Sequence, residues 1–169
     1  ELENLLEYKV IKHILNSAGI ERFMDYQMDM VRLGIGLYGV SASGIKGLRN
    51  VSTLRTTILQ IQHVPAGDSI GYSRRTYVDR DSRIAIIPIG YADGLDRHFS
   101  NRGGEVSISG KRCPIVGNIC MDACMIDVTD TDAQEGDPVI VFGEELPVSE
   151  LSDKLKTIPY EILTSVSPR

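Results

Sequence analysis

A tyrosine closely followed by two arginines is the combination in this sequence best suited to proton transfer. Tyr72 comes after the turn-forming run 65–68 and before Arg74 and Arg75, and the chain then returns to the apolar run 84–87. A tyrosine hydroxyl can transfer a proton, and nearby guanidinium groups make its phenolate easier to form. The alternative is a tyrosine that packs at a strand end beside two solvated arginines, and this segment alone leaves both open.

The composition is that of an ordinary globular protein. The 169 residues suffice for one good-sized core, with 42% apolar and 24% charged residues. A net charge of -5 argues against a nucleic-acid or anionic-membrane surface. The longest apolar runs, such as 84–89, are too short to span a bilayer, and the acidic start does not resemble a signal peptide. We therefore expect a cytoplasmic protein that binds neither nucleic acid nor membrane.

The three cysteines are Cys113, Cys120 and Cys124. Their odd number and clustering favour reduced thiols of a cytoplasmic protein over a disulfide framework. Cys120 and Cys124 have no histidine close by in the sequence, so we expect no metal site.

The first part of the chain reads as a strand, a helix and a second strand. Residues 11–15 predict a short strand, 20–30 a helix with apolar residues at helical spacing, and 30–39 a strand that carries Arg32. This order indicates a βα unit, and the small residues 16–19 after the first strand suit a helix N-terminus that can hold an anion such as phosphate. A charge within a strand needs a partner, so Arg32 is either in a structural ion pair or a ligand contact.

The small-residue run 41–47 indicates a linker, and we expect two domains, 1–45 and 46–169. The second of these predicts mostly short strands separated by turns: 51–63, 83–89, 105–109, 125–128 and 138–142. Gly103–Gly104 and residues 109–111 are typical of hairpin turns. Residues 148–156 predict a helix capped by Ser149, and Pro159 suits the first turn of another.

Several segments, taken in order, carry a resemblance to a known family. They are Asn16-Ser17-Ala18, Arg32 to Gly39, Tyr72 with its flanks, Ile87 to Gly94, Pro114 to Asp122, Pro159-Tyr160-Glu161 and Ser167-Pro168-Arg169. Together they resemble bacterial alanine racemase, from about Lys12 to the last residue. The resemblance implies a mainly β fold, in which the C-terminal β domain follows a remnant of a pyridoxal-phosphate-binding (β/α)8 barrel.

The resemblance also implies roles for residues around the substrate. Tyr72 matches the catalytic tyrosine, one of two acid/base groups that a racemase needs on opposite faces of Cα. Met121 matches the position whose backbone N–H binds the substrate carboxylate, and Tyr91 matches a tyrosine that narrows the entrance. Taken singly, Met121 could be a core residue and Tyr91 an ordinary turn tyrosine.

Other residues match the cofactor-binding set of the family. Ser17, with the backbone of Gly34 and Ile35, matches part of the phosphate cradle, and Tyr160 a further phosphate contact. Arg32 matches the residue that faces the pyridine nitrogen of the cofactor. Because guanidinium keeps its proton in proteins, that nitrogen would stay unprotonated, which limits side reactions such as transamination.

One part of the family's site is missing from the sequence. The family binds pyridoxal 5'-phosphate through a lysine near the start of the barrel, and none of the six lysines here stands in that context. The barrel arginine beside the substrate carboxylate is absent as well. We therefore expect a chain that lacks the Schiff-base lysine and is inactive alone. It is either the C-terminal portion of a longer racemase or a natural, inactive chain.

The resemblance implies an isomerase, an alanine racemase that makes D-alanine for cell-wall peptidoglycan as a head-to-tail homodimer. Two alternatives stay open. One is a racemase for serine or another small amino acid, and the other is a non-catalytic dimerisation module. The presence of Tyr72, Arg32 and Met121 speaks against the module, because docking alone would not need all three.

Overall fold

The computed structural model describes residues 5–168, and the chain divides into two compact units, Glu1–Val51 and Ser52–Arg169. That these units are the predicted domains 1–45 and 46–169 stays a prediction. In the described part, no helix is both long and apolar enough to cross a membrane.

The first unit contains two extended segments that run parallel around a short helix. Its elements are α1 (Ser17–Arg22) and the 3₁₀ helices η2 (Met24–Tyr26) and η3 (Ile35–Tyr38). The extended segments touch at a parallel bridge between Asn16 and Arg32, where the Arg32 N–H donates to the Leu15 carbonyl at 2.8 Å. The chain therefore has the strand-helix-strand order of a βα unit.

The lengths predicted for these elements are wrong. The predicted strands 11–15 and 30–39 are reduced to that single bridge, and Ile35 to Tyr38 form a 3₁₀ helix instead. The predicted helix 20–30 begins earlier, because Asn16 caps α1 by accepting a hydrogen bond from the Gly19 N–H at 3.0 Å. It ends at Arg22, where Phe23 leaves the helical conformation. A strand with one neighbour satisfies few backbone groups, which explains why the parallel ladder stops after one bridge.

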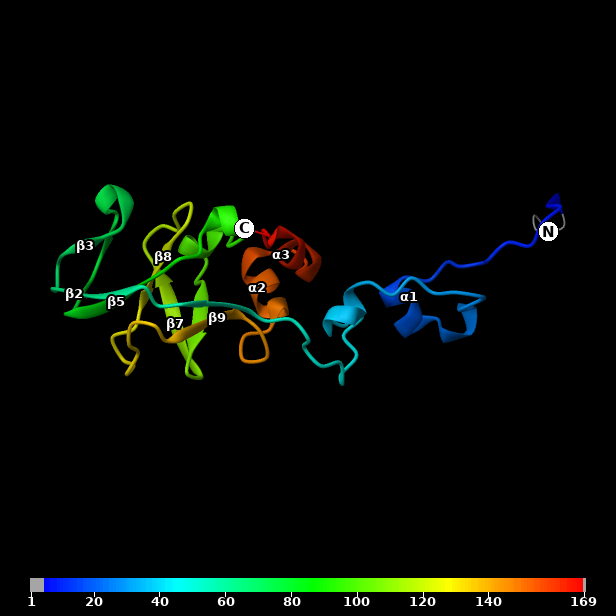
Figure 1. Ribbon diagram of the computed structural model, residues 1–169, viewed down its shortest axis with the longest axis horizontal. Coiled ribbons are helices and arrows are strands. Elements are labelled where there is room, and N and C mark those ends of the chain that lie inside the picture. Colours follow the sequence, from blue (N-terminus) through cyan, green and yellow to red (C-terminus); the bar gives the residue numbers. More distant parts are fainter. Residues whose placement is uncertain (1–4, 169) are drawn as a thin grey trace. The chain divides into compact units, whose positions relative to one another are not determined.

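The second unit is mainly β, as the sequence predicts (Figure 1). Its strands are β1 (Leu54–Thr57), β2 (Gln60–Val64), β3 (Ser69–Ile70), β4 (Thr76–Tyr77), β5 (Ser82–Ile87), β6 (Glu105–Ile108), β7 (Lys111–Val116), β8 (Cys124–Asp127) and β9 (Pro138–Phe142). Seven of them form one sheet in the order β1-β9-β6-β7-β8-β5-β2, and the pairs within it are antiparallel. Strands β3 and β4 form a separate hairpin.

The large sheet curls because its two edge strands are consecutive in the chain. β1 and β2 stand at opposite ends of the strand order, yet only Ile58 and Leu59 separate them. The N–H of Ile58 donates to the Asp137 carbonyl at 3.0 Å and the N–H of Leu59 to the Ile86 carbonyl at 2.8 Å. The sheet therefore closes on itself through this joint, which leaves little of its edge unpaired.

The interior of the curled sheet is the core of the second unit. Strand β5 contributes to this core, and Ala85 and Ile87 on it are fully buried. Other fully buried side chains come from neighbouring strands, among them Val106, Ile108, Ile126, Val139 and Val141. These are mostly β-branched residues, which pack well on pleated strands.

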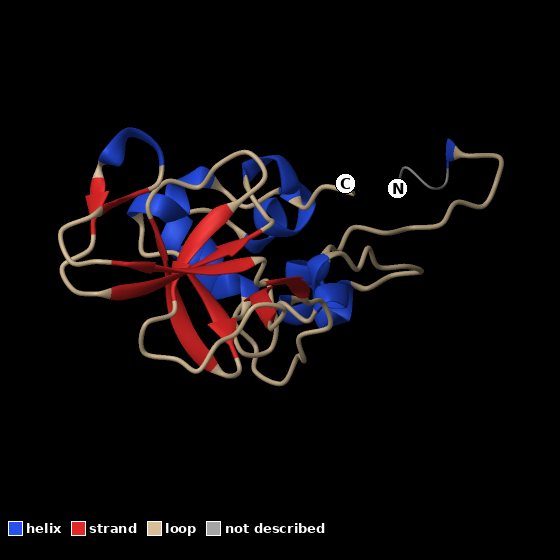
Figure 2. Ribbon diagram, turned by 60° about the vertical axis from the view of Figure 1, so that its left-hand side comes forward, coloured by secondary structure: helices blue, strands red, loops and turns tan. Residues whose placement is uncertain are grey.

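Two helices, α2 (Val148–Leu155) and α3 (Pro159–Ser165), lie beside one another next to the sheet (Figures 1 and 2). The apolar face of α2 buries Leu151 and Leu155, as its sequence pattern predicts. Pro159 occupies the first turn of α3, as predicted, but Ser149 does not cap α2, because the N-cap is Pro147.

Three 3₁₀ helices connect the strands: η4 (Tyr72–Arg74), η5 (Tyr91–Asp93) and η6 (Arg97–Asn101). The predicted turn at Ser109 and Gly110 does join β6 to β7, and both residues have positive φ, as a tight hairpin requires. The predicted hairpin turn at Gly103–Gly104 is wrong. The Gly104 N–H donates to the Phe99 carbonyl at 3.0 Å and so closes η6.

Candidate active site

The first unit brings together the residues that the sequence predicts as a phosphate cradle. Ser17 is almost fully buried at the start of α1. Its Oγ accepts hydrogen bonds from the N–H of Gly34 at 3.0 Å and of Gly36 at 3.4 Å. Ile35, between these glycines, is buried and holds η3 in place. Two backbone donors therefore converge on one oxygen, a geometry that also suits an oxygen of an anion.

Gly36 is a donor that the sequence analysis missed, and the small-residue pattern Gly34-Ile35-Gly36 is the signal that could have identified it. A side chain at Gly36 would meet the end of the Leu33 side chain at 2.8 Å, and Leu33 is half exposed, so it could move aside.

Arg32 lies beside this cradle on the second extended segment. Its side chain is exposed, and one terminal guanidinium nitrogen donates to the Ile14 carbonyl at 2.9 Å. The structure thus holds the guanidinium by a backbone contact across the parallel bridge. An ion-pair partner for Arg32 is not seen among residues 5–168.

At the other end of α1, Glu21 fixes the segment that follows η3. Its carboxylate accepts hydrogen bonds from the Ser41 hydroxyl at 2.8 Å, from the hydroxyl and the N–H of Ser43, and from the Ala42 N–H at 3.2 Å. The hydrogen bonds from Ser43 and Ser41 lower the pKa of Glu21. The helix that presents Ser17 is therefore tied to the following segment at both of its ends.

In the second unit, Tyr72 stands at the tip of the β3–β4 hairpin. Ser69 pairs with Tyr77 and Ile70 with Thr76, so the hairpin presents Tyr72 on a short 3₁₀ turn. The Tyr72 side chain is 72% exposed.

The backbone around Tyr72 is unusual. Gly71 before it has φ 73°, and a side chain at Gly71 would meet the Met125 methyl at 2.9 Å. Ser73 and Arg74 after it have φ 68° and 47°, in the left-handed region that costs non-glycine residues about 1 kcal/mol or more. Three residues with positive φ, Gly71 before Tyr72 and Ser73 and Arg74 after it, thus shape the turn that carries Tyr72.

Tyr91 and Met121 lie on two loops that are hydrogen-bonded to each other. The N–H of Tyr91 donates to the Cys120 carbonyl and the N–H of Ala92 to the Met121 carbonyl, both at 3.0 Å. Gly90 permits this approach, because a side chain there would lie 2.3 Å from both carbonyl oxygens. The predicted entrance tyrosine and the predicted carboxylate-binding position are thus joined backbone to backbone.

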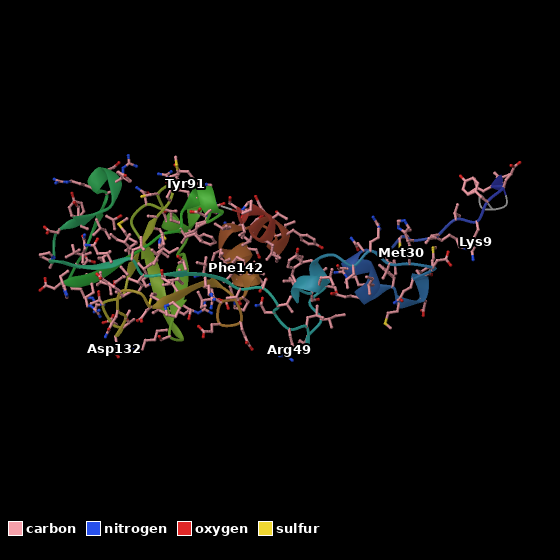
Figure 3. All side chains as sticks on the ribbon, viewed as in Figure 1. Lys9, Met30, Arg49, Tyr91, Asp132 and Phe142 are labelled. Atoms are coloured by element: carbon pink, nitrogen blue, oxygen red, sulfur yellow. The ribbon has the colours of Figure 1, made fainter. Side chains whose placement is uncertain are left out.

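Tyr72, Tyr91 and Met121 line one cavity of about 750 Å³. The structure therefore gathers three residues that the sequence analysis selected from separate segments. The other residues of its lining are Ser73, Arg97, Asn118, Ile119, Cys120, Asp122 and Ala123. The sequence analysis did not select Arg97, whose only signal is its position shortly after the Gly90–Gly94 segment. Figure 3 labels Tyr91 at the rim of the second unit.

Tyr160 does not line this cavity. It lies in the first turn of α3 with its side chain half exposed, and its carbonyl accepts a hydrogen bond from the Thr164 hydroxyl at 2.8 Å. Its predicted phosphate contact stays a prediction. Among the described residues, no group of three or more histidines, cysteines, aspartates or glutamates is arranged to hold a metal ion.

Comparison with known proteins identifies the family. The family description "Alanine racemase, C-terminal domain" matches residues 51–169, and "Alanine racemase, N-terminal domain" matches residues 1–42. The chain belongs to the alanine racemase family. The mainly β unit is therefore the family's C-terminal domain, as the resemblance implies.

Among the family's curated members, alanine racemase 2 of Caldanaerobacter subterraneus subsp. tengcongensis is 44% identical over 168 residues, covering 94% of this chain and 43% of that protein. Alanine racemase of Helicobacter pylori is 36% identical over 185 residues, covering 99% of this chain and 49% of that protein. The chain thus spans less than half the length of these relatives.

Solved structures of the family agree with the fold. Alanine racemase of Clostridium difficile 630 in complex with cycloserine matches with a TM-score of 0.91 and 38% identity, covering 99% of this chain and 46% of that one. Alanine racemase of Bartonella henselae with covalently bound pyridoxal phosphate matches with a TM-score of 0.87 and 40% identity, covering 95% and 45%.

Proposed function

We propose that the complete protein containing this chain is an alanine racemase that interconverts L- and D-alanine, and that Tyr72 is one of its two acid/base groups. The observation that carries the proposal is the shared cavity of Tyr72, Tyr91 and Met121. Family membership supports it, because the curated relatives are named alanine racemase.

The cofactor of the proposed enzyme is pyridoxal 5'-phosphate, which is covalently bound in the related Bartonella structure. The first unit fits its phosphate, because the N–H groups of Gly34 and Gly36 already point at a single oxygen, Ser17 Oγ. Ser17, Gly34 and the adjoining Ile35 would hold the phosphate, with Tyr160 as a further contact. When bound, the cofactor withdraws electrons from the amino acid and makes the proton on its Cα removable.

Arg32 would face the pyridine nitrogen. A guanidinium offers only hydrogen-bond donors and does not act as an acid in proteins. A nitrogen facing this group is kept from gaining a proton, which limits how strongly the ring withdraws electrons. Arg32 would thus favour simple proton exchange over transamination.

Racemisation requires a proton to leave one face of Cα and another to arrive on the opposite face. Tyr72 is suited to one of these transfers, because it lines the cavity and its side chain is exposed there. The exposed guanidinium groups of Arg74 and Arg75 follow directly, and positive charge favours the phenolate that removes a proton. The second group would be the cofactor-binding lysine, which none of the lysines of this chain matches.

The substrate would be held by the two joined loops. The Met121 N–H would bind the carboxylate, and the Tyr91 ring would narrow the space around the small side chain of alanine. A cavity of about 750 Å³ is of the size that takes a drug-sized ligand, so it has room for more than alanine alone. This surplus suits a substrate that shares its site with a cofactor.

The family resemblance also implies where the proposed enzyme acts and what its product is for. The proposed product, D-alanine, would serve peptidoglycan synthesis in the cell wall, and the enzyme would act in the cytoplasm as a head-to-tail homodimer.

The test is to measure racemisation of L-alanine by the complete protein with pyridoxal phosphate, for the parent and for Tyr72→Phe. Tyr72→Phe should lose about 10²–10⁴-fold in kcat, which is typical of a lost acid/base group, and should still bind the cofactor. Tyr77→Phe is the matched control, since Tyr77 is an exposed tyrosine on the same hairpin, and it should keep full activity. An inactive parent, or a Tyr72→Phe variant as active as the control, would refute the proposal.

A further inference from the structure

Residues at and just after the end of α3 are hydrogen-bonded to the turn that carries Tyr91. The N–H of Ser167 donates to the Asp93 carbonyl at 3.0 Å, and the Ser165 hydroxyl is shared between the carbonyls of Gly94 at 3.1 Å and Ile162 at 2.9 Å. We name residues 165–167 the tail clasp. Its two hydrogen bonds reach two successive carbonyls of the Tyr91 turn, so they hold the backbone and not one mobile side chain.

The clasp and the turn are in very close contact at Gly94. This residue has φ 103°, and a side chain on it would lie 2.3 Å from the Ser165 carbonyl oxygen. Both the positive φ and the lack of space demand glycine. The Gly94 backbone is thus seated directly against the backbone of the clasp.

Besides the tail clasp, the Tyr91 turn is held by a hydrogen bond within itself and by hydrogen bonds to a neighbouring loop. The Asp93 carboxylate accepts a hydrogen bond from the Gly90 N–H at 2.9 Å, which closes the turn. On the far side, Tyr91 and Ala92 donate to the loop of Cys120 and Met121. The turn is therefore fixed between the Met121 loop and the tail clasp.

Tyr91 borders two cavities, and so does Arg97. Tyr91 lines the cavity of about 750 Å³ that contains Tyr72 and Met121, and it also lines a cavity of about 320 Å³. The smaller cavity lies between the Tyr91 turn and α3, and its other lining residues are Gly94, Asp96, Arg97, Glu161, Ile162 and Ser165. Open space is thus available on both sides of Tyr91.

We propose that the tail clasp is a positioning device that sets the size limit of the substrate cavity by keeping the Tyr91 turn in place. This inference rests on the proposed function for its link to substrate. With the clasp in place, Tyr91 stays at the border of the two cavities. With the clasp loosened, the turn is held only by its internal Asp93 bond and by the Met121 loop, and Tyr91 can shift into the smaller cavity and admit a longer side chain.

Ser167→Pro removes the N–H of the clasp. Proline has no backbone N–H, and the residue before it must be extended. Val166 already has φ -60° and ψ 118°, which fits this requirement. Ser167→Ala is the matched control, because it changes the same side chain and keeps the N–H. Ser165→Ala is a second loosening variant, which removes the hydroxyl that the Gly94 and Ile162 carbonyls share.

The first measurement is hydrogen exchange on this chain. The amides of Asp93, Gly94 and Leu95 all donate within the turn. In Ser167→Pro they should exchange about fivefold faster, the factor that the loss of one backbone hydrogen bond corresponds to, whereas Ser167→Ala should change them by less than about twofold. Unchanged protection of these amides in Ser167→Pro would overturn the clasp, whether or not the protein is a racemase.

The second measurement is made on the complete protein, as kcat/KM for alanine and for 2-aminobutyrate, which is one methylene longer. Enzymes commonly discriminate one methylene by about 10–200-fold. Ser167→Pro and Ser165→Ala should lower the ratio of kcat/KM for alanine to that for 2-aminobutyrate about fivefold, by raising kcat/KM for 2-aminobutyrate. Ser167→Ala should keep the parent's preference. If Ser167→Pro speeds amide exchange but leaves the preference for alanine over 2-aminobutyrate unchanged, the size-limit role is overturned and the proposed function stays intact. A parent that fails to racemise alanine would refute the proposed function, and the exchange data alone would then decide the clasp.

Discussion

The backbone N–H of Ala92 lies 3.0 Å from the carbonyl oxygen of Met121 and donates to it. This bond joins the loop of the proposed entrance tyrosine to the loop of the proposed carboxylate-binding position. Because it connects backbone to backbone, it depends on how closely the loops approach and not on the side chain at either position. The closeness of approach depends on Gly90.

Gly90→Ala should destabilise the second unit and separate these loops. The new methyl group would lie 2.3 Å from the carbonyl oxygens of both Cys120 and Met121, so backbone must move. We expect a loss of about 1–3 kcal/mol in the free energy of unfolding, the range typical of overpacking, measured by urea denaturation. Gly110→Ala is the control, because Gly110 has positive φ but nothing within 4 Å of an added side chain. A smaller loss for Gly90→Ala than for Gly110→Ala would contradict the close approach.

Limited proteolysis of this chain should cut the first unit before the second. Among the described residues, Leu15 and Ile35 are the only buried apolar residues before residue 52, and all others belong to the second unit. Ile11 and Met24 in the first unit are 70% exposed. With so little apolar surface buried, the first unit should open often, while a fragment close to residues 52–169 should survive. Early cleavage within β5 or β9, with residues 5–51 spared, would show the reverse order.

Thiol labelling of the native chain at pH 8 should modify Cys120 alone. Burial, with Cys120 as a lesser cause, raises the pKa of Cys124 to about 12, and burial also raises the pKa of Cys113. A thiol with a raised pKa stays protonated and unreactive below that pKa, so the reactivity of Cys124 should rise only toward about pH 12. Cys120 is only partly buried and lines the cavity of Tyr72 and Tyr91.

Mass spectrometry after labelling should therefore find one modified thiol in the native chain and three after denaturation. Cys120→Ala should leave the native chain unlabelled. Labelling of Cys113 or Cys124 under native conditions at a rate like that of Cys120 would show that the core around β7 and β8 opens readily.

The sequence predicts local features where the signal is local. The Leu151–Leu155 spacing on α2 and the proline at the start of α3 each depend on a few adjacent residues, and both are confirmed. Strand β7 is not predicted, because Lys111, Arg112 and Pro114 give it a turn-like composition. It becomes a strand because it pairs with β6 on one side and β8 on the other.

The same distinction applies to the candidate site. Tyr72, Tyr91 and Met121 could be selected from the sequence because each stands in a recognisable segment, and the structure shows that they share a cavity. The tail clasp could not be predicted. The contact joins the Ser167 N–H to the Asp93 carbonyl. Every residue has a backbone carbonyl and every residue except proline has a backbone N–H, so no residue type marks the contact.

In the proposed dimer, Tyr72 should act on the cofactor bound by the other chain. Tyr72 belongs to the second unit, whereas Ser17 and Arg32 belong to the first. We expect complementation when complete chains carrying Tyr72→Phe are mixed with complete chains that lack the cofactor-binding lysine. Each variant alone forms homodimers that should be nearly inactive, because one acid/base group is missing from every site.

A mixed dimer has one site that combines the lysine of one chain with Tyr72 of the other. Equal mixing makes about half of the dimers mixed, with one whole site in two, so about a quarter of the activity of the unaltered enzyme should return. Differently tagged chains allow the mixed dimers to be purified and assayed directly. If Tyr72 served its own chain, both sites of a mixed dimer would be defective. Purified mixed dimers without activity would therefore refute the shared site, while Tyr72→Phe alone would still report whether the hydroxyl is needed.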